Sequence, residues 1–192
     1  MIGRFRNLAI TVLVAVGLGG CDTVSTTFDN ATSLWSKPLV YECPSYRIIK
    51  DAAHIVAFKP GSGRDLVDIN FEASIRDATL ECLTYVKKNT KAGHMEARFS
   101  VDFAARRGPA NKTRSATLPY FVHVTDKNKD MLYREPLKIT VNFPGNRSAV
   151  QISGETIPLE LPLRSDVSSK DYIIYTGFAL NREQLEYNRA QQ

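Results

Sequence analysis

Hydrophobic and polar residues alternate along most of the chain after Leu39. A period of two places successive side chains on opposite faces of a strand, so alternation is typical of strands with one buried and one solvated face. The clearest alternating runs are Asp68–Ile75, Met95–Phe103, Leu137–Phe143 and Tyr172–Phe178. Weaker runs follow the same pattern at His54–Phe58, Thr79–Tyr85, Tyr120–Thr125, Ala149–Ile152 and Ile157–Leu163.

Turn-forming residues separate these runs. They lie at Pro60-Gly61-Ser62-Gly63, Lys91-Ala92-Gly93, Asp126–Asp130 and Pro144-Gly145-Asn146. Many short strands with frequent turns and one wet face predict antiparallel sheets packed in two layers. We therefore expect an all-β fold, an immunoglobulin-like or fibronectin-like antiparallel β-sandwich. Pro158 and Pro162 predict that their strand lies at a sheet edge, because proline cannot donate to a ladder.

One short α-helix is expected at the C-terminus. Asn181 can cap its first turn and Gln184, three residues on, can return the bond, while Leu180 and Leu185 are placed for a hydrophobic staple. The segment spans about two turns and is mostly polar, so it has to dock on the sandwich to be stable.

The first twenty residues have the features of an export signal. Met1–Asn7 carries Arg4 and Arg6 and no acidic residue, and Leu8–Leu18 is an uncharged apolar run. This run is shorter than the roughly 18 residues that a membrane-spanning helix needs. A basic start, a short apolar segment and small residues after it are typical of a secretory signal peptide.

The next residues resemble a known processing site. Leu18-Gly19-Gly20-Cys21 resembles the lipobox of bacterial lipoproteins, in which the cysteine is lipidated and the chain is cut just before it. The resemblance implies that Cys21 is the lipidated residue, and more than one acyl chain would attach it stably to a membrane. In enteric bacteria the family reads an aspartate directly after the cysteine, here Asp22, as a signal to stay in the inner membrane, a rule that differs between lineages. An ordinary signal peptide is the alternative.

The chain is thus divided into three parts. Residues 1–20 form the signal peptide, residues 21–38 the lipidated cysteine with a flexible Thr- and Ser-rich tether, and residues 39–192 a single sandwich domain with the C-terminal helix. Loss of Arg4 and Arg6 with the signal peptide lowers the net charge from +5 to +3. The overall composition is that of an ordinary globular protein.

Two cysteines remain after Cys21 is set aside. Export places Cys43 and Cys82 in an oxidising compartment, where we expect them to form a disulfide. A redox-active pair is the alternative, but the close Cys-x-x-Cys spacing is missing.

No motif in the sequence carries recognisable catalytic chemistry. Gly61-Ser62-Gly63 lacks the spacing of a nucleophile elbow, and His94-Met95 alone is weak evidence for copper. Asp126–Asp130 imitates the start of a calcium loop, but Met131 and Leu137 stand where the glycine and the bidentate glutamate belong. We expect a protein that is not an enzyme and that needs no metal or cofactor.

The basic residues are unevenly distributed. Four cations without an acid lie close together, namely Arg106, Arg107, Lys112 and Arg114, and Lys87, Lys88 and Lys91 form a second group. Such loops suit anionic lipid headgroups or an acidic partner, although two ordinary solvated loops would look the same.

These features predict a periplasmic lipoprotein of the bacterial cell envelope. We expect it to meet the membrane through its lipid and to bind an envelope protein as an accessory subunit, with a sheet edge, the basic loop or the C-terminal helix as the contact surface. A module that binds a small ligand or glycan is the alternative, and an envelope hydrolase is a third. Nucleic acid is excluded as a partner by the expected location.

Overall fold

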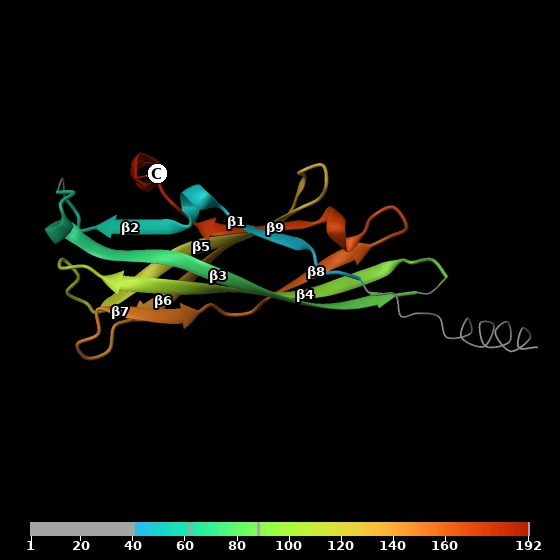
Figure 1. Cartoon of the computed structure of the whole chain (residues 1–192), viewed down its shortest axis with the longest axis horizontal. Coiled ribbons are helices and arrows are strands. Elements are labelled where there is room, and N and C mark those ends of the chain that lie inside the picture. The colour runs from blue at the N-terminus through green and yellow to red at the C-terminus, as the bar shows by residue number, and fades with distance from the viewer. Residues whose placement is uncertain (1–40, 62, 88, 192) are drawn as a thin grey trace, which may run out of the picture. The chain divides into compact units, whose positions relative to one another are not determined.

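The longest strands of the protein form one hairpin that runs through the whole domain (Figure 1). The structure, a computed structural model, describes residues 41–61, 63–87 and 89–191, and Tyr41–Gln192 forms one compact unit. The signal peptide, the lipobox with Cys21 and the tether lie outside the described residues.

Two sheets pack face to face. The first has the order β1 (Ser45–Ile48), β9 (Ile173–Phe178), β5 (Ser115–Thr125) and β6 (Met131–Asn142). The second has the order β2 (His54–Phe58), β3 (Ile69–Val86), β4 (Gly93–Arg107) and β7 (Ala149–Ser153), with β8 (Ile157–Leu163) also paired to β4. Short 3-10 turns lie at Lys50–Ala52, Leu66–Asp68 and Ser169–Asp171, and the helix α2 at Arg182–Ala190.

This architecture confirms an all-β sandwich with a short C-terminal helix. β1 runs parallel to β9, and the other strand pairs that the structure describes are antiparallel. The Asp126–Asp130 segment is the turn between β5 and β6, in which the Asp126 carboxylate accepts the backbone N–H groups of Asn128 and Asp130 at 2.8 and 2.9 Å.

The sequence runs Asp68–Ile75 and Thr79–Tyr85 belong, apart from Asp68 in the preceding 3-10 turn, to one strand instead of two. β3 continues for 18 residues, and its register with β4 shifts between Ile75 and Asp77, so Arg76 is an extra residue in a β-bulge. A bulge bends the strand and redirects its side chains. Two polar residues in succession, Arg76 and Asp77, therefore mark a bulge and not a turn.

The core lies between the two sheets and is rich in aromatic residues. Phe99, Phe103, Phe143 and Phe178 are each no more than 1% exposed. The Phe103 ring contacts those of Tyr120 and Phe178, with centroid separations of 5.0 and 5.8 Å. Outward-facing polar residues alternate with these positions, as the sequence pattern requires.

Helix α2 covers the outer edge of β2 (Figure 1). The Asn188 side-chain amide donates to the carbonyls of Asp51 (3.0 Å) and His54 (2.7 Å), and the Gln184 amide reaches the carbonyl of Val56 (3.5 Å). Gln184 and Asn188 are four residues apart on the helix, which separates them by about 6 Å along its axis. This spacing is close to the ~6.7 Å between alternate strand residues such as His54 and Val56, so each amide lies beside one carbonyl. The helix therefore supplies donors to an edge that would otherwise lack partners.

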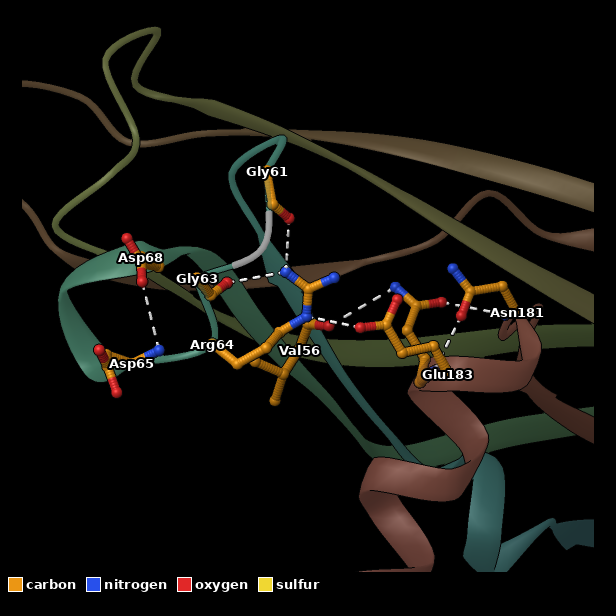
Figure 2. A network of polar contacts seen from close by, with 9 residues as sticks. Val56, Gly61, Gly63, Arg64, Asp65, Asp68, Asn181 and Glu183 are labelled. Atoms are coloured by element: carbon orange, nitrogen blue, oxygen red, sulfur yellow. Dashed lines mark hydrogen bonds and ion pairs between the residues drawn. The ribbon is translucent and has the colours of Figure 1, made fainter.

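Arg64 fixes the start of α2 to the loop between β2 and β3 (Figure 2). Its guanidinium donates to the carbonyls of Gly61 (2.9 Å) and Gly63 (2.7 Å) and to the Glu183 carboxylate (2.5 Å). Asn181 accepts the backbone N–H of Gln184 at 2.8 Å, so the capping box predicted from the sequence is confirmed. The carbonyls of Gly61 and Gly63 thus serve as part of the helix attachment.

Replacing Asn188 by alanine should lower the free energy of unfolding by about 1–3 kcal/mol, because two carbonyls lose a buried donor. Urea unfolding followed by circular dichroism measures the change. Arg182→Ala is the control, since the Arg182 side chain is 92% exposed and its pair with Glu186 is a surface contact. Equal effects of the two substitutions would contradict this role of Asn188.

The edge formed by β8 is also protected. Pro158 and Pro162 have no N–H to offer to a further strand, and the Tyr172 hydroxyl donates to the carbonyl of Pro162 at 2.6 Å. Among the described strands, β8 pairs with β4 alone, so it is the edge strand that its prolines predict.

Cys43 and Cys82 form the expected disulfide, with their Cα atoms 5.7 Å apart. The bond joins the segment that precedes β1 to the second half of β3. It therefore fastens the point where the chain enters the sandwich to the longest hairpin.

Candidate functional site

The outer face of the five-stranded sheet carries a hollow of about 600 Å³ over β2, β3, β4 and β7. Two cross-strand rows of residues form it. The first row is His54, Ser74, Ala104 and Gln151, and the second is Val56, Glu72, Arg106 and Ala149. Because Ser74 and Ala104 are small and central in their row, the surface is low between longer side chains.

Arginines from three separate segments border this depression. Arg76 comes from the bulge in β3, Arg106 from β4, and Arg147 from the segment before β7. All three are exposed, and none forms an ion pair with another described residue. We call the depression bounded by Arg76, Arg106 and Arg147 the arginine hollow. With Glu72 included, its formal charge is +2.

The predicted basic loop is divided by the structure. Arg106 belongs to the arginine hollow, whereas Lys112 and Arg114 lie in the loop between β4 and β5. Asn111 organises that loop, because its buried side chain donates to Asn70 and to the carbonyl of Ser115 and accepts the N–H of Arg114. Arg107, at the end of β4, donates its N–H to the carbonyl of Ser148.

Sequence reasoning did not find Arg76 and Arg147 as partners of Arg106. Their proximity depends on the register of β3, β4 and β7, which alternation does not determine. The signal that was available is the break in alternation at Arg76, where a polar pair interrupts a regular strand.

The other sequence candidates lie in structural contacts. His94 stacks on Tyr85 at a centroid distance of 5.1 Å, and His123 stacks on Phe121 at 4.4 Å. Within the described part of the chain, no group of three or more His, Cys, Asp or Glu side chains is arranged to hold a metal ion.

A second surface is the unpaired side of β3. The Gly154 N–H donates to the carbonyl of Val101, which is the cross-strand partner of Ala78. Val101 therefore turns its carbonyl away from β3, and Ala78 must likewise turn its backbone groups away from β4. The backbone N–H and C=O groups of every second residue after Ala78, up to Val86, also point away from β4. We call this side of β3, from Ala78 to Val86, the open edge.

The open edge has unmet backbone groups and incompletely covered side chains. Asp77 accepts the Ala78 N–H at 2.8 Å, but no hydrogen bond from another described residue reaches the outward groups between Leu80 and Val86. On the inner face Leu80 and Val86 are only half-buried, whereas Phe99, the cross-strand partner of Leu80, is fully buried. On the outer face Leu83 and Tyr85 are 52% and 50% exposed.

Four side chains link folding stability to pH in the same direction. Hydrogen bonds from Arg64, from Lys59 and from the Ser168 backbone lower the pKa values of Glu183, Asp68 and Asp171 respectively, and burial lowers the pKa of His123. In each case the pKa is higher in the unfolded chain than in the folded protein, so the unfolded chain binds the proton at a higher pH. Acidification therefore favours unfolding.

We expect stability to fall in two stages between pH 7.5 and pH 3. The stabilisation that depends on neutral His123 is lost as the pH drops below the ordinary histidine value of 6.5, and the stabilisation from the three carboxylates is lost below about 4.5. Urea unfolding at a series of pH values measures both stages. His123→Gln should flatten the first stage only, and greater stability at pH 5 than at pH 7 would contradict the assignment.

No helix in the described residues is long and apolar enough to cross a bilayer. In comparisons with known proteins, no family model, no curated protein and no solved structure matches the chain.

Proposed function

We propose that the protein is a lipid-anchored periplasmic lipoprotein of the cell envelope that acts without catalysis, as an accessory subunit of an envelope assembly. Its contact with the assembly is the open edge of β3, to which an extended segment of the partner protein adds as a further strand. The observation that carries the proposal is the row of outward backbone groups between Leu80 and Val86 without a described partner.

The other contact surfaces considered from the sequence are less suited to this role. The C-terminal helix is occupied with the edge of β2 through Asn188 and Gln184. The prolines of β8 and the Tyr172 hydroxyl protect that edge. The open edge is different, because it combines unmet backbone groups with exposed apolar side chains.

The side chains at the open edge specify the chemistry of the partner segment. An added strand would lie beside Leu83 and Tyr85 on the outer face and beside Leu80 and Val86 on the inner face. Neighbouring side chains on one face of a sheet contact each other, so apolar residues on both faces of the incoming strand fit best. We therefore expect an extended, largely apolar segment.

Thr84→Pro tests strand addition directly. The Thr84 N–H points to the open edge, so proline removes the donor needed by a partner without removing a bond to β4. The partner captured by cross-linking in cells should be lost from Thr84→Pro and retained by Thr84→Val. The unfolding midpoint of each variant shows whether the domain is intact.

A second pair of variants tests the side chains. Leu83→Lys should lose the same partner, while Leu132→Lys should keep it, and both wild-type leucines are 52% exposed. If Leu83→Lys and Thr84→Pro both capture the partner protein as well as the wild type does, the open edge is not the contact surface.

The lipid anchor rests on the resemblance of Leu18-Gly19-Gly20-Cys21 to a lipobox. Cys21→Ala should abolish labelling by a fatty-acid analogue and release the protein from the membrane fraction, since the acyl chains provide the attachment. Unchanged membrane retention without acyl labelling would contradict the anchor.

The arginine hollow favours a second candidate function, the binding of a small ligand or glycan. Its volume of about 600 Å³ is within the range of small-molecule sites, roughly 300–1,000 Å³.

A further inference from the structure

We infer that the arginine hollow binds the acidic group of a sugar, either a sugar phosphate or a sugar carboxylate. The inference deepens the second candidate function and is independent of strand addition at the open edge. It rests on the convergence of Arg76, Arg106 and Arg147 over a low floor of small side chains.

The three arginines point to an anion. Guanidinium groups carry a full charge at all physiological pH values, and like charges placed together repel each other unless a counter-charge lies between them. Glu72 is directly opposite Arg106 in the register, yet no ion pair joins them. The residues that line the hollow carry a formal charge of +2, and Asp77 and Asp102 lie near Arg76 in the adjoining depression without forming an ion pair with it. A bound anion would balance that charge.

Arginine is suited to both acidic groups named here. Its planar fork donates two parallel hydrogen bonds to a carboxylate or a phosphate, and such charge-assisted bonds are about twice as strong as neutral ones. Arg76 follows Ser74 by two residues and lies on the same face of β3, at the position where the bulge begins.

The remaining polar residues favour a ligand with hydroxyl groups. His54, Ser74 and Gln151 lie in one cross-strand row, and no hydrogen bond from another described residue involves their side chains. Their side chains both donate and accept, as does a hydroxyl group. Glu72 can accept from a hydroxyl, although its charge repels an anion placed beside it. A sugar with one acidic group satisfies both parts of the hollow.

The hollow lies away from the point where the chain enters the domain. The Cys43–Cys82 disulfide marks that entry, and Cys82 is eight residues, or about 25 Å, along β3 from Ser74.

Isothermal titration calorimetry on the purified full chain in an uncharged detergent tests the inference. The probes are glucose 6-phosphate, glucuronate, inorganic phosphate and uncharged glucose. We expect saturable binding of at least one acidic sugar, with weaker binding of inorganic phosphate and none of glucose up to about 10 mM. Comparing glucose 6-phosphate with glucuronate distinguishes the two acidic groups.

Two variants on β4 locate the site. Arg106→Ala should weaken binding about tenfold, as expected for loss of a charge-assisted bond. Arg98→Ala removes the same charge from the same strand outside the hollow and should change binding less than about twofold. Both arginines are exposed.

Three results would overturn the inference: no saturable binding of either acidic sugar, equal affinity for inorganic phosphate, or equal weakening by Arg98→Ala and Arg106→Ala. Arg106 lies outside the open edge, so partner capture should persist in Arg106→Ala. Failure of sugar binding can thus be told apart from failure of strand addition.

Discussion

Replacing Phe103 by alanine should lower the free energy of unfolding by about 3–5 kcal/mol, the largest effect that we expect from a single substitution. Phe103 is 1% exposed and lies between the two sheets, in contact with the rings of Tyr120 and Phe178. Truncation removes both ring contacts and leaves a cavity that the two sheets cannot close without shifting. Urea unfolding followed by fluorescence or circular dichroism measures the loss.

A graded series separates the cavity from other causes. Phe103→Leu keeps most of the apolar volume and should cost only about 1–2 kcal/mol, while the exposed Leu132→Ala should stay within about 0.5 kcal/mol. A loss below about 1 kcal/mol for Phe103→Ala would show that the two sheets are not packed around this ring.

Removing the disulfide should have the next largest effect. The double variant Cys43→Ser, Cys82→Ser should be less stable by about 2–4 kcal/mol, since the bond closes a loop with a sequence separation of 39 in the unfolded chain. It also releases the entry of the chain from β3. Denaturant unfolding under non-reducing conditions gives the difference between the two proteins.

A reducing agent supplies the matched control for the disulfide. Dithiothreitol should destabilise the wild type toward the value of the double variant and leave the double variant unchanged. If the wild type and the double variant unfold at the same denaturant concentration without a reducing agent, the disulfide does not contribute to stability.

Alternation predicts the sandwich well because the inner faces of the strands are mostly apolar, with Thr176 in β9 as a buried exception whose hydroxyl donates to the Phe121 carbonyl. In β4, for example, Met95, Ala97, Phe99 and Val101 are nearly inaccessible, and the residues between them are at least partly exposed. The same reasoning misplaces Asp68, which was expected on a wet strand face. Asp68 is 6% exposed and pairs with Lys59 at the end of a 3-10 turn. Lys59 is only nine residues before Asp68, but their contact depends on the path of the intervening loop, which alternation does not describe.

The helix shows a similar division between local and tertiary information. The caps of α2 are visible in the sequence because Asn181 and Gln184 are three residues apart and bond to each other. The attachment of α2 to β2 is not visible, because Asn188 is separated by 134 residues from the His54 carbonyl that it contacts. A polar helix was correctly expected to dock, but its docking site depends on the tertiary fold.

The surfaces proposed for binding depend on sheet register in the same way. Arg106 was selected from a run of neighbouring cations, whereas its neighbours in space, Arg76 and Arg147, come from other segments. The open edge is likewise set by where β2 ends along β3, because β2 pairs only as far as Ser74. No property of the Thr79–Tyr85 sequence alone shows that one side of it lacks a strand.

The most direct test of the proposed function is photo-cross-linking in cells from the open edge. A photoreactive amino acid is placed at position 85 and, as a control, at position 132, where the wild-type side chains are 50% and 52% exposed. We expect position 85 alone to cross-link to an extended apolar segment of one envelope protein, mapped by mass spectrometry and lost when Thr84→Pro is added. Cross-links from position 85 only to residues 22–40 of this chain, only to a second copy, or to the same proteins as position 132 would contradict the proposal.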